Sequence, residues 1–166
     1  MLWRNFVNGL NIITKNFTSL LLVGMVILVF MQILLRELFG TSFNWISDIS
    51  KYSMIWVVFL GSSYAFQHGA HVAVDTLMDK VSVNGKKVLF LLVLITSSIF
   101  LIALVYTGLE LVSSTFLQNS PNINIPMAYI YLVIPISGVL MFINLFDVII
   151  RFLKTGIGIE EGGTDL

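Results

Sequence analysis

The sequence predicts an all-α integral membrane protein with four transmembrane helices, and two observations support this fold class. Of the 166 residues, 57% are hydrophobic and 11% are charged, and the mean hydropathy is +0.95. A soluble domain needs a larger share of polar residues to cover its surface. The hydrophobic residues also gather in four stretches, each near the roughly 20 residues that cross a bilayer core. These predicted spans cover about residues 17–35, 45–67, 88–110 and 129–153, within a membrane domain of residues 16–154.

The composition excludes several function classes. The formal net charge is zero and the basic residues form no run or tail, so nucleic-acid binding has no electrostatic basis. The chain has no cysteine, which excludes disulfides, thiolate metal sites and cysteine nucleophiles. Thirteen Phe, three Trp and five Tyr suit lipid-facing and interfacial positions. The partner that this composition predicts first is therefore the lipid bilayer.

The first 15 residues are amphipathic. Trp3, Phe6 and Leu10 fall on one helical face, so residues 1–15 are expected to form a short helix that lies in the cytoplasmic membrane interface. A frayed tail is the alternative. The uncharged run that follows, residues 16–35, is longer than the apolar region of a signal peptide, which has about 7–15 residues. The first span is therefore expected to remain as a membrane anchor.

The second span, residues 45–67, begins polar and becomes wholly apolar. Asp48 and Lys51 lie in its first turns, and no charge follows in the rest of the span. Gly61 and Ala65 are four residues apart, and small side chains at this spacing let a neighbouring helix approach closely. The same pair also arises by chance in apolar helices, so this interpretation stays open.

The last two spans are joined by an uncharged connection. Its stretch Ser120–Pro126 predicts a compact, extended turn, because residues that precede proline avoid the helical region. Pro135 lies inside the fourth span and removes one backbone donor, so we expect a kink there, with Gly138 beside it. The Gly-rich, acidic residues 155–166 are expected to form a flexible cytoplasmic tail.

The basic residues predict the orientation of the chain. Seven of the nine fall on one side of the predicted membrane and two, Arg36 and Lys51, fall on the other. Since Lys and Arg are enriched in cytoplasmic loops, both chain ends and the second loop are expected in the cytoplasm. The seven are Arg4, Lys15, Lys80, Lys86, Lys87, Arg151 and Lys154.

Two histidines, His68 and His71, follow the second span, and Asp75 comes four residues after His71. A metal site would fit if this segment is helical, because His71 and Asp75 would then share a face. Catalytic zinc, however, takes three protein ligands. The favoured interpretation is a cytoplasmic loop whose turn is fixed by hydrogen bonds of His71 and Asp75, with no metal or other cofactor in the chain.

A surface for another membrane protein is the sharper hypothesis for residues in and near the second span. The alternative is that Arg36 is an interfacial anchor and that Asp48 and Lys51 form a weak surface ion pair. No ionisable residue lies near the middle of a predicted span, whereas ion-coupled transporters keep such residues there, so this chain is expected to lack the transport chemistry itself. The candidate partner interface comprises Arg36, Asp48, Lys51, Trp56, Gly61 and Ala65.

Several short motifs, taken in their order along the chain, resemble one family. Arg36 at the exit of the first span is followed by Trp-x-x-Phe-Leu-Gly at residues 56–61, Gly-x-His-Val-x-Val-Asp at residues 69–75 and Tyr-x-x-x-Pro-x-x-Gly at residues 131–138. This layout resembles the small four-helix membrane subunit of tripartite ATP-independent periplasmic (TRAP) transporters. The resemblance covers nearly the whole chain.

One departure from the family pattern falls at the start of the second span. The family usually has two acidic residues there, followed by an arginine. This chain has Ser47 in place of one acid, keeps Asp48, and has Lys51 where the arginine is expected. Any role that needs two carboxylates at this place is therefore in doubt.

The resemblance implies a three-protein transporter in the bacterial inner membrane. A periplasmic substrate-binding protein captures an organic acid, and a large multi-span membrane subunit moves it with a sodium gradient. The small subunit is a scaffold and not an enzyme, and sodium binds to the large partner rather than to this chain. The substrates of the family include C4-dicarboxylates and sialic acids, and the overall likeness points to the sialic acid type.

Two other functions stay open from the residues themselves. One is a small membrane enzyme that uses His68, His71 and Asp75. The other is a self-contained exporter that works as a homodimer, although the expected lack of a carboxylate in the middle of a span speaks against it.

Overall fold

The computed structural model describes residues 2–40, 43–67 and 83–155, and these are almost entirely helical. The predicted all-α class is confirmed for this part of the chain. The elements are α1 (Leu2–Phe39), α2 (Asn44–Gln67), α4 (Val83–Ser114), α5 (Met127–Tyr131) and α6 (Val133–Thr155).

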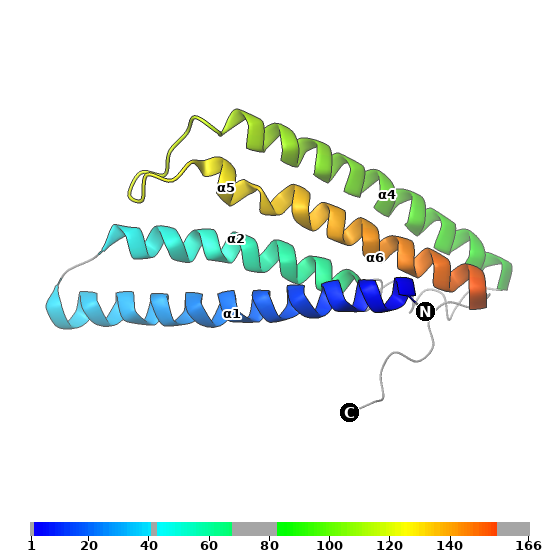
Figure 1. Ribbon diagram of the computed structural model, residues 1–166, viewed down its shortest axis with the longest axis horizontal. Helices are drawn as coiled ribbons and strands as arrows, with labels where there is room; N and C mark the ends of the chain where they lie inside the picture. The colour runs from blue at the N-terminus through cyan, green and yellow to red at the C-terminus, as the bar shows by residue number, and fades with distance from the viewer. Residues whose placement is uncertain (1, 41–42, 68–82, 156–166) are drawn as a thin grey trace, which may run out of the picture.

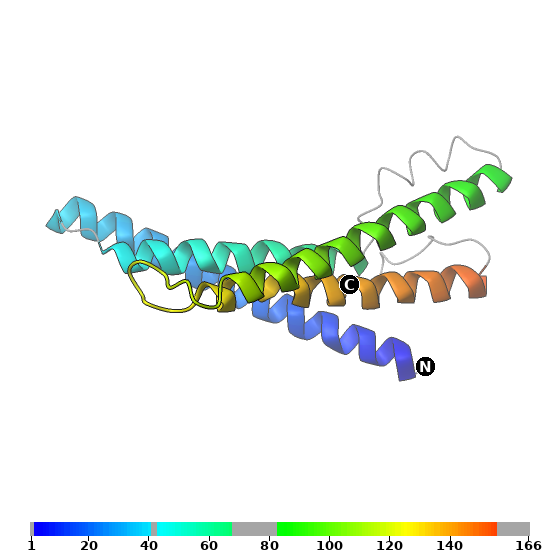
Figure 2. The ribbon, with the colours of Figure 1, turned by 90° about the horizontal axis from the view of Figure 1, so that it is seen from above.

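The long helices lie side by side in the order α1, α2, α6, α4 (Figure 1). Each packs against the next in this row, and α1 also contacts α6. Among the described residues, α4 contacts neither α1 nor α2. The view from above shows that α1 crosses the other helices at an angle (Figure 2). The chain therefore forms an open row of helices rather than a closed bundle, and α1 and α4 are its edges.

The connections alternate between the two ends of this row. The links from α1 to α2 and from α4 to α5 lie at one end, and the start of α1 and the end of α6 lie at the other (Figure 1). This arrangement puts both ends of the described chain on the same side, as the predicted topology requires. Which side faces the cytoplasm stays a prediction.

Three helices are long and apolar enough to cross a membrane, and they contain Trp3–Phe39, Val88–Ser114 and Met127–Ile150. The predicted span at residues 45–67 is present as α2, but α2 is not among these three. The reason is its polar content, because residues such as Asp48, Lys51 and Gln67 lower its mean hydropathy. Its 24 residues measure about 36 Å, which would cover a bilayer core of about 30 Å. The predicted second span is therefore not confirmed by apolarity.

The structure differs from the predicted separate helix at residues 1–15. Helix α1 continues without a break from Leu2 to Phe39, and its 38 residues measure about 57 Å. This segment has no proline, and Asn11 bonds within the helix, donating from Nδ2 to the carbonyl of Val7 at 3.0 Å. Both Val7 and Asn11 are buried. The first turns thus continue α1 and pack against other helices, and their predicted position in the membrane interface stays a prediction.

The predicted kink in the fourth span is present. Pro135 has no N–H to donate to the carbonyl of Tyr131, one turn earlier, and the helix is interrupted at Leu132, between α5 and α6. The kink lies against α4, where a Cβ atom added at Gly108 would come within 3.0 Å of the Pro135 ring. One turn further, a Cβ added at Gly138 would lie 2.7 Å from Val105. Helices α4 and α6 therefore approach closely because glycine is present on both sides.

Candidate functional site

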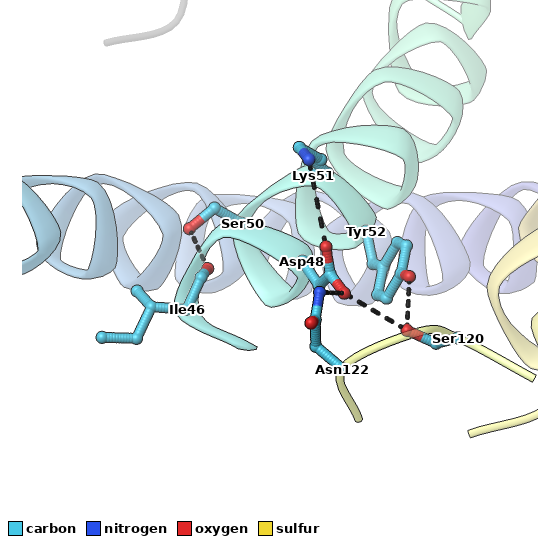
Figure 3. A network of polar contacts seen from close by, with 7 residues as sticks. All are labelled: Ile46, Asp48, Ser50, Lys51, Tyr52, Ser120 and Asn122. Atoms are coloured by element: carbon cyan, nitrogen blue, oxygen red, sulfur yellow. Dashed lines mark hydrogen bonds and ion pairs between the residues drawn. The ribbon is translucent and has the colours of Figure 1, made fainter. Parts of the chain in front are cut away.

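The first polar cluster joins the start of α2 to the loop between α4 and α5, and Figure 3 shows it from close by. Asp48 is buried, and its Oδ2 accepts hydrogen bonds from Asn122 Nδ2 at 2.7 Å and from Ser120 Oγ at 3.4 Å. The hydroxyls of Tyr52 and Ser120 share a hydrogen bond of 2.6 Å. Lys51 approaches the other carboxylate oxygen at 3.9 Å. We call these five residues the Asp48 cluster.

Local structure brings these groups together. Asp48 and Tyr52 are four residues apart on one face of α2. The α4–α5 loop, residues 115–126, folds back on itself: Ser120 N–H donates to the Ile125 carbonyl at 2.9 Å, and Asn119 pairs with Pro126 in an antiparallel bridge. The backbone at Asn124 has a φ of 56°, which asparagine tolerates better than most residues. The predicted compact turn is thereby confirmed, and it presents the Ser120 and Asn122 side chains to α2.

The Asp48–Lys51 ion pair is present, but it is the lesser contact of this carboxylate. The Lys51 side chain is 70% exposed, whereas that of Asp48 is 10% exposed. An exposed lysine contributes little to an ion pair, typically up to about 1 kcal/mol. A hydrogen bond to a charged group contributes about 1.5–3 kcal/mol. Asp48 is therefore held mainly by the α4–α5 loop of its own chain.

The second polar cluster lies near the other end of α2 and joins α1, α2 and α6. Asn11 Nδ2 donates to Asn144 Oδ1 at 2.7 Å, and Asn144 Nδ2 donates to Asn11 Oδ1 at 3.1 Å. Asn144 Nδ2 also donates to the carbonyl of Ser63 at 2.8 Å. All three residues are buried. We call them the Asn144 cluster.

Sequence reasoning missed the Asn144 cluster. Asn11 and Asn144 are each unusual as amides beside or within an apolar run, and this is the signal that could have singled them out. Their pairing could not be read from spacing, because they are 133 positions apart. Interhelical hydrogen bonds in a membrane contribute about 0.6–2 kcal/mol each, so this cluster adds a modest stabilisation to the contact of three helices.

The structure separates the remaining sequence-predicted residues into inward and outward positions. Arg36 is exposed and pairs with Glu37 at 3.3 Å. Trp56 is half-buried, and its ring meets that of Phe17 of α1 edge-on, with the centroids 6.4 Å apart. A Cβ added at Gly61 would lie 3.8 Å from the Thr18 side chain, also on α1. Trp56 and Gly61 thus contact α1 of the same chain.

One exposed stripe of α2 contains two of the predicted residues. Exposed residues recur at intervals of three and four along this side of α2, and Lys51 and Ala65 are the first and the last of them. The stripe joins a positive charge at one end to small side chains at the other. We call it the α2 outer stripe, and it comprises Lys51, Met54, Val58, Ser62 and Ala65.

His68, His71 and Asp75 lie outside the described residues, so the predicted loop structure is not tested. Within residues 2–40, 43–67 and 83–155, no group of three or more His, Cys, Asp or Glu side chains is placed to hold a metal ion. The polar contacts described above join helices and loops of one chain.

Comparison with known proteins gives one consistent family. Residues 25–155 match the family described as tripartite ATP-independent periplasmic transporters, DctQ component. The chain is 26% identical over 119 residues to the C4-dicarboxylate TRAP transporter small permease protein DctQ of Rhodobacter capsulatus, a match that covers 70% of this chain and 52% of that protein. The chain thus spans about half the length of this relative.

Two further relatives extend the comparison. A putative TRAP transporter small permease protein of Haemophilus influenzae is 32% identical over 124 residues, which cover 73% of this chain and 75% of that protein. The isethionate TRAP transporter permease protein DctMQ of Oleidesulfovibrio alaskensis is 24% identical over 105 residues. These residues are 62% of this chain and 16% of that relative, so the similar region there is part of a much longer polypeptide.

Proposed function

Since this chain belongs to the DctQ-component family of TRAP transporters, we propose that it braces a large, sodium-coupled membrane subunit during uptake of an organic acid. The observation that carries this proposal is the open row of helices. Its edges, α1 and α4, expose most of their apolar side chains, so the chain offers wide apolar surfaces to a neighbouring membrane protein.

The bracing role rests on how the row is fastened. The Asp48 cluster ties α2 to the loop that leads into α5, and the Asn144 cluster ties α1, α2 and α6 together. The close contact of Gly108 and Gly138 adds α4 to α6. A unit fastened at both ends resists bending, which suits the static part of a transporter.

Besides the apolar edges α1 and α4, we propose the α2 outer stripe as the part of the partner surface that makes close and polar contacts. Helices in lipid gain little hydrophobic energy by associating, so small side chains and polar contacts have to hold a partner. The stripe offers Ser62 and Ala65 for close approach and Lys51 for a polar contact, with exposed Arg36 near the same end. Asp48, Trp56 and Gly61 would support this surface from inside the chain.

The partners and substrate follow from the relatives. One relative is named as a single permease protein, DctMQ, in which the region similar to this chain is a small part, so a large permease component is the natural partner. Relatives are named for C4-dicarboxylate and isethionate, both small organic anions. We infer an organic anion, a sialic acid or C4-dicarboxylate being the specific candidates, delivered by a periplasmic binding protein and driven by sodium bound to the large subunit.

Purification of the chain from its own cells tests this function. A C-terminal tag, mild detergent and mass spectrometry should yield a stoichiometric large membrane subunit. Replacement of Ser62 and Ala65 by leucine should reduce this yield, while replacement of Val139 of α6 by leucine serves as a matched control on another exposed face. If the chain purifies alone, the bracing role is wrong, and the homodimeric exporter becomes the better hypothesis.

A further inference from the structure

The α4–α5 loop, residues 115–126, carries apolar side chains that no part of the described chain covers. Leu117 is 96% exposed, and Phe116, Ile125 and nearby Tyr129 are also exposed. The rings of Phe116 and Tyr129 lie 6.4 Å apart, so they form one surface. We propose that this loop inserts its apolar tip into the interfacial layer of the lipid bilayer. The inference does not depend on the identity of the large partner.

The loop is held in the conformation that exposes these side chains. Its own backbone closes it, because the Met127 N–H donates to the Gln118 carbonyl at 2.8 Å, close to the Asn119–Pro126 bridge. The buried Asp48 then fixes it from outside through Asn122, as Figure 3 shows. Since the loop is ordered within the folded chain, Leu117 does not turn inward to escape water. The exposure of Leu117 thus follows from the contacts that hold the loop, and an apolar environment would remove this side chain from water.

The bilayer is the occupant that the position and charge of the loop favour. The candidate spans Val88–Ser114 and Met127–Ile150 end on its two sides, so its tip is within a few residues of the membrane surface. No charged residue occurs between Leu111 and Phe146. Aromatic side chains such as Phe116 and Tyr129 are enriched at the level of lipid headgroups.

The other connection at the same end has a different character. The α1–α2 link is preceded by exposed Arg36 and Glu37, and exposed Lys51 follows it on α2. Charged side chains of this kind remain in water or meet a charged partner. The α4–α5 loop is therefore the connection suited to lipid, whereas the charged side chains around the α1–α2 link are suited to water or to a protein partner. Tyr106 and Leu109 of α4, the helix that leads into the loop, are exposed as well.

Fluorescence quenching tests this proposal, and the natural lack of cysteine makes it simple. Leu117→Cys is labelled with an environment-sensitive dye in the full chain, together with any membrane subunit that co-purifies. The sample is reconstituted in vesicles of phosphatidylethanolamine and phosphatidylglycerol. Glu37→Cys is the matched control at an exposed, charged position of the same end. Each label is then exposed to iodide in the water and to lipids that carry a nitroxide just below the headgroup.

The expected result is that nitroxide lipids quench the label at 117 strongly while iodide does not, and that iodide quenches the label at 37 more than the label at 117. Quenching of the 117 label by iodide would show that the loop stands in water and would overturn the proposal. Protection of the 117 label from both quenchers would mean that a protein covers the loop, and this would overturn it as well.

Discussion

The Asp48 cluster and the Asn144 cluster both join segments that are distant in the sequence, yet they are built from different groups. The first holds a carboxylate near one end of the row of helices, with an exposed lysine 3.9 Å away. The second holds two neutral amides that exchange hydrogen bonds near the other end of α2. A buried carboxylate needs several donors, whereas a pair of amides can satisfy one another. In this chain a charged carboxylate lies where a loop supplies hydrogen-bond donors, and neutral amides lie where helices contact helices.

Of the changes to the two clusters, removal of the Asp48 carboxylate should have the largest effect on stability. Asp48→Ala leaves the donors of Asn122 and Ser120 without their acceptor and releases the α4–α5 loop. We expect the free energy of unfolding to fall by about 3 kcal/mol, since breaking a buried charged contact costs about that much. Unfolding of the purified chain in mixed micelles of mild detergent and dodecyl sulfate measures it. Unchanged stability in Asp48→Ala would mean that the cluster does not fasten the loop.

Removal of the Asn144 amide should have a smaller effect. Asn144→Ala deletes the contacts to Asn11 and Ser63, and we expect a loss of about 1–2 kcal/mol, because hydrogen bonds between helices in a membrane contribute less than those of a buried charge. The same unfolding measurement checks this. Asn16→Ala, at an exposed position of α1, is the control and should be neutral.

A double substitution tests whether Asn11 and Asn144 stabilise the chain as a pair. If Asn11 and Asn144 act as a pair, the effects of Asn11→Ala and Asn144→Ala should add to more than the effect of both together. Strict additivity would show that the two amides are stabilised by other groups. A loss in Asn144→Ala larger than in Asp48→Ala would reverse the ranking of the two clusters.

The ion pair of Lys51 should have the smallest effect on stability. Lys51→Met keeps the side-chain stem and removes the charge, and we expect a change below about 0.5 kcal/mol because the lysine is exposed. If Lys51 belongs to the partner surface, the same variant should lower the yield of the large subunit while leaving unfolding unchanged. A large loss of stability would instead show that the Asp48 cluster depends on the charge of Lys51.

Much of the fold could be predicted because long apolar runs, Pro135 and the Ser120–Pro126 turn act locally. Helix α1 has no break at the predicted boundary between residues 15 and 16, since a polar stretch such as that near Asn11 can continue a helix if another helix bonds to it. The burial of Asp48 was not predicted either, because its partner Asn122 lies 74 positions away.

The small residues show most clearly where local patterns stop being informative. Gly61 and Ala65 have the spacing of a close helix contact, but Ala65 is exposed and Gly61 has ordinary room beside α1. The close approach occurs at Gly108 and Gly138, which have no such spacing within one helix. Spacing describes a single helix, whereas a close approach also depends on the surface of the helix that it meets.

The distances between paired residues along the chain have a consequence for biosynthesis. Asn11 is made 133 residues before Asn144, and Asp48 is made 74 residues before Asn122. At about 5–20 residues per second, roughly 7–27 seconds pass between the synthesis of Asn11 and that of its partner Asn144. During that interval the side chain of Asn11 and the carbonyl of Ser63 lack the hydrogen bonds that Asn144 gives them in the folded chain. The polar contacts between the first and the second half of the chain therefore form only after most of the chain has been made.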